Sequence, residues 1–457
     1  MADKSIFDEL LESKSLFKNR EVLRPTYTPG ELPHRNQQIN YLASILVSAL
    51  KGETPSNIFI YGKTGTGKTA VAKFVGKELE FKAKEISEKN FQCLSDLAFD
   101  CLEDGNINYL KPAYDYLGFS DFFGPDLESL MRTNVNYIYI NCQHVDTQYR
   151  VLTHIANSLI KIWEERLPLT GLPTDEVYNR LRESIENAGG VTTIILDEID
   201  KLVEKSGDDI LYNLSRINSD LKESKANLIG ITNTLKFTEF LDPRVKSSLG
   251  EEEFSFPPYD AEQLKDILTQ RATLAFNHDL LDTAVVPLCA ALAAQEHGDA
   301  RRALDLLRIS AELAERDGIV KVEEKYVRKA LNKIEQDIVA EVIHTLPPQS
   351  KLVLLGIILN EEGKIEKLTT GMAFDTYIQL CKKVNIDPLT QRRVTDLISE
   401  LDMLGIINAR VVSFGRGGRT RLIQMSVPIV NTKQTLEESE ILRPVIDFKP
   451  RLQSTLM

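Results

Sequence analysis

The stretch Asn57–Glu80, NIFIYGKTGTGKTAVAKFVGKELE, decides the fold of the first half of the chain. A short apolar segment is followed by a glycine-rich turn and then by apolar residues at helical spacing, which predicts a strand, a loop and a helix in that order. The loop Gly62–Thr69 matches the pattern G-x-x-x-x-G-K-[ST] of a phosphate-binding loop. Glycines there let successive backbone N–H groups turn inward around phosphates, and the start of the helix adds its dipole.

The side chains of this loop predict a bound nucleotide. Lys68 is expected to reach the β- and γ-phosphates, and Thr69 is expected to hold Mg²⁺. The predicted cofactors are therefore ATP or ADP with Mg²⁺. The residues predicted to bind them in the loop are Gly65, Thr66, Gly67, Lys68 and Thr69.

Further apolar runs predict a parallel α/β fold. Strands are expected at 135–141, 191–196, 227–233 and 253–256, and the helical patterns between them include 150–165 and 208–222. Strands that alternate with helices and are apolar on both faces indicate a mainly parallel sheet covered by helices on each side. We therefore assign residues 1–259 to one α/β base domain.

Two acids follow the apolar run Ile194–Leu196, where the open end of a parallel sheet would meet the phosphate loop. This is a Walker B pattern. Asp197 is expected to hold magnesium through water, and Glu198 to orient or activate the attacking water.

The β pattern stops after Pro257-Pro258, and Asp260–Gln263 has the pattern of a capping box at the start of a helix. Residues 260–344 are predicted to form a helical lid. Beyond Pro347-Pro348, three helical patterns and two β-type runs predict a winged helix-turn-helix at 345–430, followed by a C-terminal tail at 431–457.

The last domain carries a compact basic patch. Residues 405–425 contain four arginines and no acid. Arg416, Arg419 and Arg421 lie in the hairpin, whose glycine-rich tip fits a minor groove. Arg392 and Arg393 fall at the start of the third helix, where recognition helices meet the major groove. We expect these five arginines to bind double-stranded DNA.

Bulk properties set limits on other functions. The 457 residues carry a net charge of −12, and the acidic insertion 85–132 alone accounts for −7. No apolar run is long enough to span a membrane, the N-terminus has no secretory signal, and the five cysteines show no CxxC pair. We expect a cytoplasmic, nucleoid-associated protein with no membrane partner, no zinc ribbon and no disulfide framework.

Several motifs resemble those of the archaeal AAA+ replication initiators, relatives of the largest subunit of the eukaryotic origin recognition complex and of the cell-division-cycle helicase loader. The resemblance covers about residues 23–427. It rests on GKTGTGKT, IILDEID, GITNTLKF, LDPRVKSSL, FPPYDAEQL and GDARRALDLLRISAELAE. The long acidic insertion departs from the family pattern.

The resemblance implies roles for further residues. It makes Asn233 the sensor-1 residue, Arg301 the sensor-2 arginine and Arg244 an arginine finger that serves a neighbouring subunit. The remaining implied contacts are Tyr259, Arg271 and the segment 27–35 with Arg35 for the nucleotide, and Arg150 for DNA. Each of these residues also has a plainer interpretation, as the end of a strand, a packed aromatic side chain or an exposed helical arginine.

The resemblance implies an archaeal, ATP/ADP-switched initiator that recognises double-stranded origin DNA, helps to load the replicative helicase and acts with other initiator subunits. Its ATPase activity is expected to be weak and regulatory. Two other functions fit the same motifs. One is a motor ATPase such as a branch-migration helicase, and the other is a transcription regulator with a phosphate-binding loop.

Overall fold

The computed structural model describes residues 15–104, 134–145, 147–234, 236–277, 280–363, 367–413 and 419–450, without side chains for 90–104, 238, 413 and 419. The chain divides into two compact units, one up to Val327 and one from Arg328. We describe each unit by itself.

The first unit contains a five-stranded sheet in which every neighbouring pair is parallel. The strand order is β2-β3-β4-β1-β5. The strands are β1 (Ile58–Gly62), β2 (Val135–Asn141), β3 (Val191–Asp197), β4 (Lys225–Thr232) and β5 (Glu252–Phe256). All five begin and end within two residues of the apolar runs in the sequence, and the predicted parallel sheet is confirmed.

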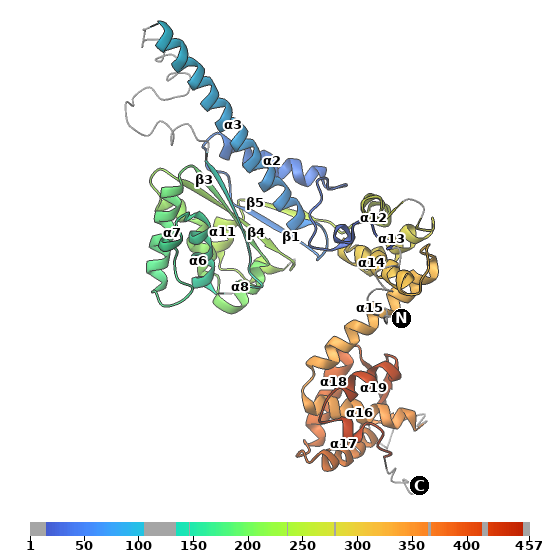
Figure 1. Cartoon of the computed structure of the whole chain (residues 1–457). Coiled ribbons are helices and arrows are strands. Elements are labelled where there is room, and N and C mark those ends of the chain that lie inside the picture. Colours follow the sequence, from blue (N-terminus) through green and yellow to red (C-terminus); the bar gives the residue numbers. More distant parts are fainter. Residues whose placement is uncertain are drawn as a thin grey trace, which may run out of the picture. The chain divides into compact units, whose positions relative to one another are not determined.

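Helices cover both faces of this sheet (Figure 1). On one face, α2 (Asn36–Leu50) and α3 (Lys68–Asp104) pack against alternate residues of β1, β3 and β4. The helices of the other face pack against the residues in between. They are α6 (Gln148–Leu159), α7 (Thr174–Ala188), α8 (Ile199–Ser206), α9 (Asp209–Ser215), α10 (Phe237–Phe240) and α11 (Pro243–Leu249). The two faces of β1, β3 and β4 are therefore buried in two separate cores.

Two helices on this second face are shorter than the sequence predicts, and the patterns 150–165 and 208–222 are wrong at their C-terminal ends. The α6 helix ends at Leu159 because the amide of Asn157 bonds both N–H and C=O of Leu167 and folds the chain back. The α9 helix ends at Ser215, followed by a short 3₁₀ turn, because Asn218 pairs in the same way with the backbone of Ala226.

The acidic insertion 85–132 begins inside a helix. The α3 helix is continuous over 37 residues, so the insertion extends it as far as Asp104. The rest of the insertion lies outside the described residues.

Three helices of the first unit follow the sheet: α12 (Ala261–Ala275), α13 (Val285–Glu296) and α14 (Ala300–Arg316). The capping box at Asp260 is present, since its side chain accepts from the N–H of Gln263 and its own N–H bonds the Gln263 side chain. Asp299 caps α14 in a similar way. These caps fix where each helix begins, which matters because α14 carries Arg301.

The second unit has the predicted order of three helices and a hairpin. After α15 (Glu324–Thr345) come α16 (Pro348–Glu362), α17 (Thr370–Val384) and α18 (Gln391–Met403). The hairpin β7 (Ile407–Ser413) and β8 (Arg419–Met425) is antiparallel and is joined by the short β6 (Leu368–Thr369).

The residues that follow the hairpin belong to the same core. The α19 helix (Ile429–Glu437) crosses the boundary that we drew at 430, and Leu436, Leu442 and Val445 are buried with the winged-helix residues. The segment up to about Phe448 is thus packed rather than a free tail. Within the described part of the chain, no helix is both long enough and apolar enough to cross a membrane.

Candidate nucleotide-binding site and DNA-binding surface

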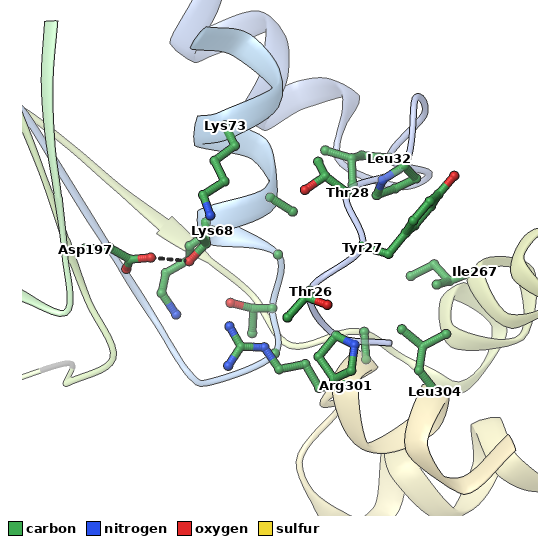
Figure 2. A pocket seen from close by; sticks show the side chains of 18 of the residues that line it. Thr26, Tyr27, Thr28, Leu32, Lys68, Lys73, Asp197, Ile267, Arg301 and Leu304 are labelled. Atoms are coloured by element: carbon green, nitrogen blue, oxygen red, sulfur yellow. Dashed lines mark hydrogen bonds between the residues drawn. The ribbon is translucent and has the colours of Figure 1, made fainter. Parts of the chain in front are cut away.

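A cavity of about 380 Å³ lies in the first unit. The lining residues come from the phosphate loop and the start of α3, the ends of β2 and β3, Asn233 after β4, Tyr259, the helices α12 and α14, and the N-terminal segment from Pro25 to Pro33. Figure 2 shows Lys68, Lys73 and Asp197 on one side of this cavity and Tyr27, Ile267 and Leu304 on another. One side is therefore charged and suited to phosphates, while the other is largely apolar and suited to a base.

The phosphate loop has the backbone that its glycines predict. Gly65 and Gly67 have φ values of +68° and +90°, a region that side chains with a Cβ rarely adopt. Lys68 Nζ donates hydrogen bonds to the carbonyls of Gly62 (2.8 Å) and Lys63 (2.7 Å). Burial lowers the pKa of Lys68 to about 8, although the nearby Asp197 carboxylate opposes the shift. The loop thus holds a buried amine whose charge a phosphate would stabilise.

Asp197 joins the two predicted motifs. Its Oδ2 accepts hydrogen bonds from the hydroxyls of Thr69 (2.6 Å) and Tyr139 (2.8 Å), and its Oδ1 accepts one from the backbone N–H of Glu198 (3.0 Å). The Thr69 hydroxyl and the Asp197 carboxylate supply oxygen ligands, which Mg²⁺ prefers. These two side chains fit the magnesium site that the sequence predicts.

Glu198 stands in an unusual backbone conformation. Its φ of +56° is left-handed and non-glycine, directly after β3 and before α8. Such strain collects at functional sites. Burial raises the pKa of the Glu198 carboxyl, and the charges of Asp197 and Asp200 add to the rise. Glu198 also lines the cavity.

Two further residues of the site, Tyr139 and Lys73, were not predicted from the sequence. Tyr139 lies on β2 opposite Ile195 of β3, and Lys73 Nζ lies 3.9 Å from the centre of the Tyr139 ring. Burial, followed by the charge of Asp197, raises the pKa of the Tyr139 hydroxyl, so it stays a donor. The alternation in VNYIYIN places Tyr137 and Tyr139 on one face of the strand, and this signal could have indicated a polar role.

The α14 helix brings charged groups to the phosphate loop. The N–H of Ala300 donates to the carbonyl of Gly65 at 3.2 Å, and Asp299 accepts from the N–H of Arg301 at 2.7 Å. A methyl group on Gly65 would lie 1.6 Å from Oδ1 of Asp299. Arg301 and the predicted sensor Asn233 both line the cavity. The structure therefore brings these two residues together with Lys68, Asp197 and Glu198.

Arg271 lines the cavity from α12 and is only 6% exposed. It donates to the carbonyls of Val22 (3.2 Å) and Tyr27 (3.4 Å), and its guanidinium lies 4.7 Å from the centre of the Tyr27 ring. Arg271 thus fixes the N-terminal segment that closes the apolar side of the cavity. It is not the exposed helical arginine of the plainer interpretation.

Tyr259 and Arg35 form a stacked pair, with the guanidinium 3.7 Å from the centre of the tyrosine ring. Tyr259 lines the cavity, and its hydroxyl lies close to Gly67. Arg35 is not among the described residues that line it, and its predicted contact with the nucleotide stays untested. Its guanidinium turns inward because the backbone carbonyls of Thr66 and Pro257 accept its N–H groups.

Arg244 lies on the surface at the start of α11, with its side chain 75% exposed. Its guanidinium donates two hydrogen bonds of 3.1 Å to the carboxylate of Asp242 and lies 5.5 Å from the centre of the Tyr212 ring. It does not line the cavity of its own chain. This placement leaves the arginine-finger prediction untested.

The predicted DNA-binding arginines are only partly described. Arg392 and Arg393 are exposed in the first turn of α18, and Arg150 is exposed in the first turn of α6. Arg421 is half-buried, and its Nη1 donates to the hydroxyl of Ser399 on α18. Arg416 and the side chain of Arg419 lie outside the described residues. The bond from Arg421 links the hairpin to the helix that carries Arg392.

Three family models match the chain in sequence order. An AAA domain matches residues 51–239, a Cdc6 AAA+ ATPase-type lid domain matches 265–332, and the C-terminal winged helix domain of CDC6 matches 341–435. The first range covers β1 to β4 of the sheet, the second covers most of α12 together with α13 and α14, and the third covers the winged helix.

Relatives match over nearly the whole chain. An ORC1-type DNA replication protein 1 of Methanosarcina mazei is 55% identical over 448 residues, which is 97% of this chain and 96% of that protein. An ORC1-type DNA replication protein of Thermococcus onnurineus is 51% identical, covering 99% and 98%. A solved structure of the Aeropyrum pernix ORC1 protein in complex with DNA is 43% identical with a TM-score of 0.69, covering 94% and 98%. On this similarity and on the three domains, the chain belongs to the Orc1/Cdc6 family of AAA+ DNA replication initiators.

Proposed function

We propose that this protein is an ATP/ADP-switched initiator that binds double-stranded origin DNA and helps to load the replicative helicase. The observation that carries the proposal is the cavity in which Lys68, Asp197 and Glu198 of the base face Arg301 of α14. A nucleotide in this cavity would contact both the sheet domain and the helical lid. The number of phosphates would then set how firmly the lid is held.

The chain's own residues divide the work of binding and hydrolysis. The loop N–H groups and Lys68 bind the β- and γ-phosphates, while Arg271 keeps Tyr27 over the apolar side. Thr69 and Asp197 would hold Mg²⁺, which supplies charge neutralisation at the phosphates. Glu198 orients the attacking water and accepts its hydrogen bond, and Asn233 and Arg301 lie beside the γ-phosphate. The products are ADP and phosphate.

Slow turnover fits this arrangement. Arg244 does not reach the cavity of its own chain, so a second initiator subunit would supply that arginine to the neighbouring site. An arginine supplied in trans raises the rate of phosphoryl transfer by a factor on the order of 10³ to 10⁵. The ATPase activity is therefore weak and regulatory when the chain is alone.

The winged helix provides the DNA contact. Arg392 and Arg393 enter the major groove from the start of α18, and Arg416, Arg419 and Arg421 reach the minor groove from the hairpin. Arg150 of α6 adds a contact from the AAA domain. The Aeropyrum pernix relative was solved in complex with DNA, and this supports DNA binding as a function of the chain. The helicase as a partner follows from the family alone.

Two other functions remain to be separated by experiment. A motor ATPase such as a branch-migration helicase would turn over ATP repeatedly, and duplex DNA would stimulate it. A transcription regulator would bind at promoters rather than at the origin, which mapping of the bound sites in the genome would detect.

ATP turnover with and without duplex DNA tests the proposal. We expect near-stoichiometric retention of nucleotide and little stimulation by DNA. Lys68→Ala should lose most nucleotide binding, because it removes the amine aimed at the phosphates, whereas Glu198→Gln should bind ATP and fail to hydrolyse it. Steady DNA-stimulated turnover would favour the motor. Normal ATP binding by Lys68→Ala in calorimetry would show that the phosphate site is placed wrongly.

A further inference from the structure

Arg35 is a buried charge next to the phosphate loop. The residue is only 2% exposed, and burial lowers the pKa of its guanidinium. Among the residues that the structure describes, it has no ion pair with a carboxylate. Burying a charge without compensation destabilises the fold unless other groups replace the hydration of that charge. The groups that contact the guanidinium therefore indicate the role of this buried charge.

Backbone carbonyls and aromatic rings replace the missing carboxylate. Nε donates to the carbonyl of Thr66 at 2.9 Å, Nη2 donates to that of Pro257 at 2.8 Å, and Nη1 makes a longer bond of 3.4 Å to His34. The guanidinium lies 3.7 Å from the centre of the Tyr259 ring and 5.7 Å from that of Phe256. The Arg35 side chain thus joins its own segment before α2 to the phosphate loop and to the connection that follows β5.

The bond to Thr66 acts on the phosphate loop directly. The carbonyl of Thr66 and the N–H of Gly67 belong to the same peptide group, and in a loop of this type the N–H groups point at the phosphates. A charged donor on the carbonyl polarises that peptide and makes its N–H a stronger donor. It also holds the peptide in one orientation, so that less entropy is lost when a phosphate binds.

The bond to Pro257 ties the same side chain to the connection between sheet and lid. Pro257 directly follows β5, and two residues later the N–H of Tyr259 donates to the carbonyl of Gly298 at 3.3 Å, just before α14. Arg35 therefore fixes the phosphate loop against the segment from which the lid helices start.

We propose that Arg35 is a positioning residue of the nucleotide site: it strengthens phosphate binding through the Thr66–Gly67 peptide and couples the phosphate loop to the connection with the lid, without touching the nucleotide. This inference rests on the proposed nucleotide-binding function and adds a residue that the cavity itself does not reveal.

Calorimetric titration of the full chain with ADP and, separately, with ATP tests the proposal. In Arg35→Met the dissociation constants for both nucleotides should rise by about tenfold, as expected for the loss of a charge-assisted hydrogen bond. The two factors should be equal because the loop binds the phosphates that ADP and ATP share. Arg35→Lys, which can reach only one of the two carbonyls, should show a rise of about threefold to fivefold on the same scale.

Arg308→Met is the matched control, since Arg308 is a half-buried arginine of α14 that pairs with Asp305 and Glu312. Its nucleotide affinities should equal those of the wild type. A purely structural role for Arg35 would lower the melting temperature and leave the affinities unchanged in a variant that is folded at the titration temperature, and that result would overturn the proposal. If Arg35→Met does not fold, unchanged affinities in Arg35→Lys would overturn it in the same way.

Titration of the wild-type chain distinguishes a failure of this proposal from a failure of the proposed nucleotide-binding function. If the wild-type chain binds neither ADP nor ATP, the nucleotide site itself is wrong, and the role of Arg35 fails with it. If the wild type binds and only the Arg35 variants are unaffected, the positioning role alone is wrong.

Discussion

The hydroxyl of Tyr139 donates a hydrogen bond of 2.8 Å to Oδ2 of Asp197, the same oxygen that accepts from Thr69 at 2.6 Å. A tyrosine of the neighbouring strand β2 therefore orients Asp197, one of the two predicted magnesium ligands. Two hydroxyl donors on one oxygen fix the orientation of the Asp197 carboxylate. Tyr139 is in turn packed under Lys73, so an element outside the two motifs helps to hold them in register.

Tyr139→Phe should weaken the use of Mg²⁺ more than the binding of nucleotide. The change removes one hydrogen bond to Asp197 and leaves the phosphate loop intact. We expect the Mg²⁺ concentration for half-maximal ATP hydrolysis to rise by about tenfold to a hundredfold, the usual cost of losing a supporting partner of a metal ligand. ADP binding measured in EDTA should stay the same.

Tyr137→Phe is the control for this prediction, because Tyr137 lies on the same face of β2 and its hydroxyl donates to the carbonyl of Ala72 instead. Equal Mg²⁺ concentrations for half-maximal hydrolysis in Tyr139→Phe and Tyr137→Phe would show that Tyr139 does not support the magnesium site.

Nucleotide affinity should fall with rising pH because of Lys68. Burial lowers the pKa of the free Lys68 amine to about 8, so the amine loses its charge above that pH, whereas bound phosphates favour the charged form. ADP binding at pH 9 should therefore take up protons, and the affinity should be lower than at pH 7 by up to about tenfold, following the charged fraction. Calorimetry in buffers of different ionisation enthalpy measures both effects. A pH-independent affinity with no proton uptake would contradict this role.

Arg301→Ala should slow ATP hydrolysis much more than it weakens ADP binding. Its proposed partner is the γ-phosphate, so hydrolysis should slow by about tenfold or more while ADP affinity changes by less than about threefold. Arg302→Ala serves as a control, since Arg302 pairs with Glu296 and does not line the cavity. An equal loss of affinity for both nucleotides would argue against a γ-phosphate sensor.

Much of the fold could be predicted because its signals are local. Strands such as β3 are apolar on both faces and end at turns or polar residues, so their limits are visible in the sequence. The ends of α6 and α9 were missed because Asn157 and Asn218 bond backbone groups 10 and 8 residues away, respectively. No periodic pattern records such contacts.

The site was predictable where a motif encodes it and not where packing decides. Lys68, Asp197 and Glu198 meet as their motifs imply. Tyr139 of β2 bonds Asp197 of the neighbouring strand β3. This contact depends on the register of the two strands, in which Asn141 lies opposite Asp197. Arg35 was expected at the nucleotide, but the direction of its side chain depends on carbonyls 31 and 222 residues away in sequence.

The hairpin should bind DNA through charge. Replacing Arg416, Arg419 and Arg421 by alanine should flatten the slope of log K against log salt by roughly 2 to 3 units if each neutralises a phosphate. At 0.1 M salt, exposed charges more than about 10 Å apart are largely screened from one another. The arginines of the hairpin therefore attract DNA phosphates even though the whole chain carries a net charge of −12. An unchanged affinity and slope on origin DNA would make the last domain a protein-docking module.

Arg392→Ala tests base readout as distinct from phosphate contact. If Arg392 reads a base edge, the change should cost about 1 to 3 kcal/mol on the preferred site and much less on random duplex. Equal losses on both duplexes, measured by titration at one salt concentration, would assign Arg392 to the DNA backbone instead.

The central claim is that bound nucleotide controls recognition of the origin by the winged helix. Footprinting across the replication-origin region of the host genome, once with ATP and once with ADP, tests it most directly. We predict protection at discrete sites, with an extent or affinity that differs between the two nucleotides and is lost in the Arg416, Arg419 and Arg421 triple variant. Uniform protection without preferred sites, or identical footprints with ATP and ADP, would contradict the account.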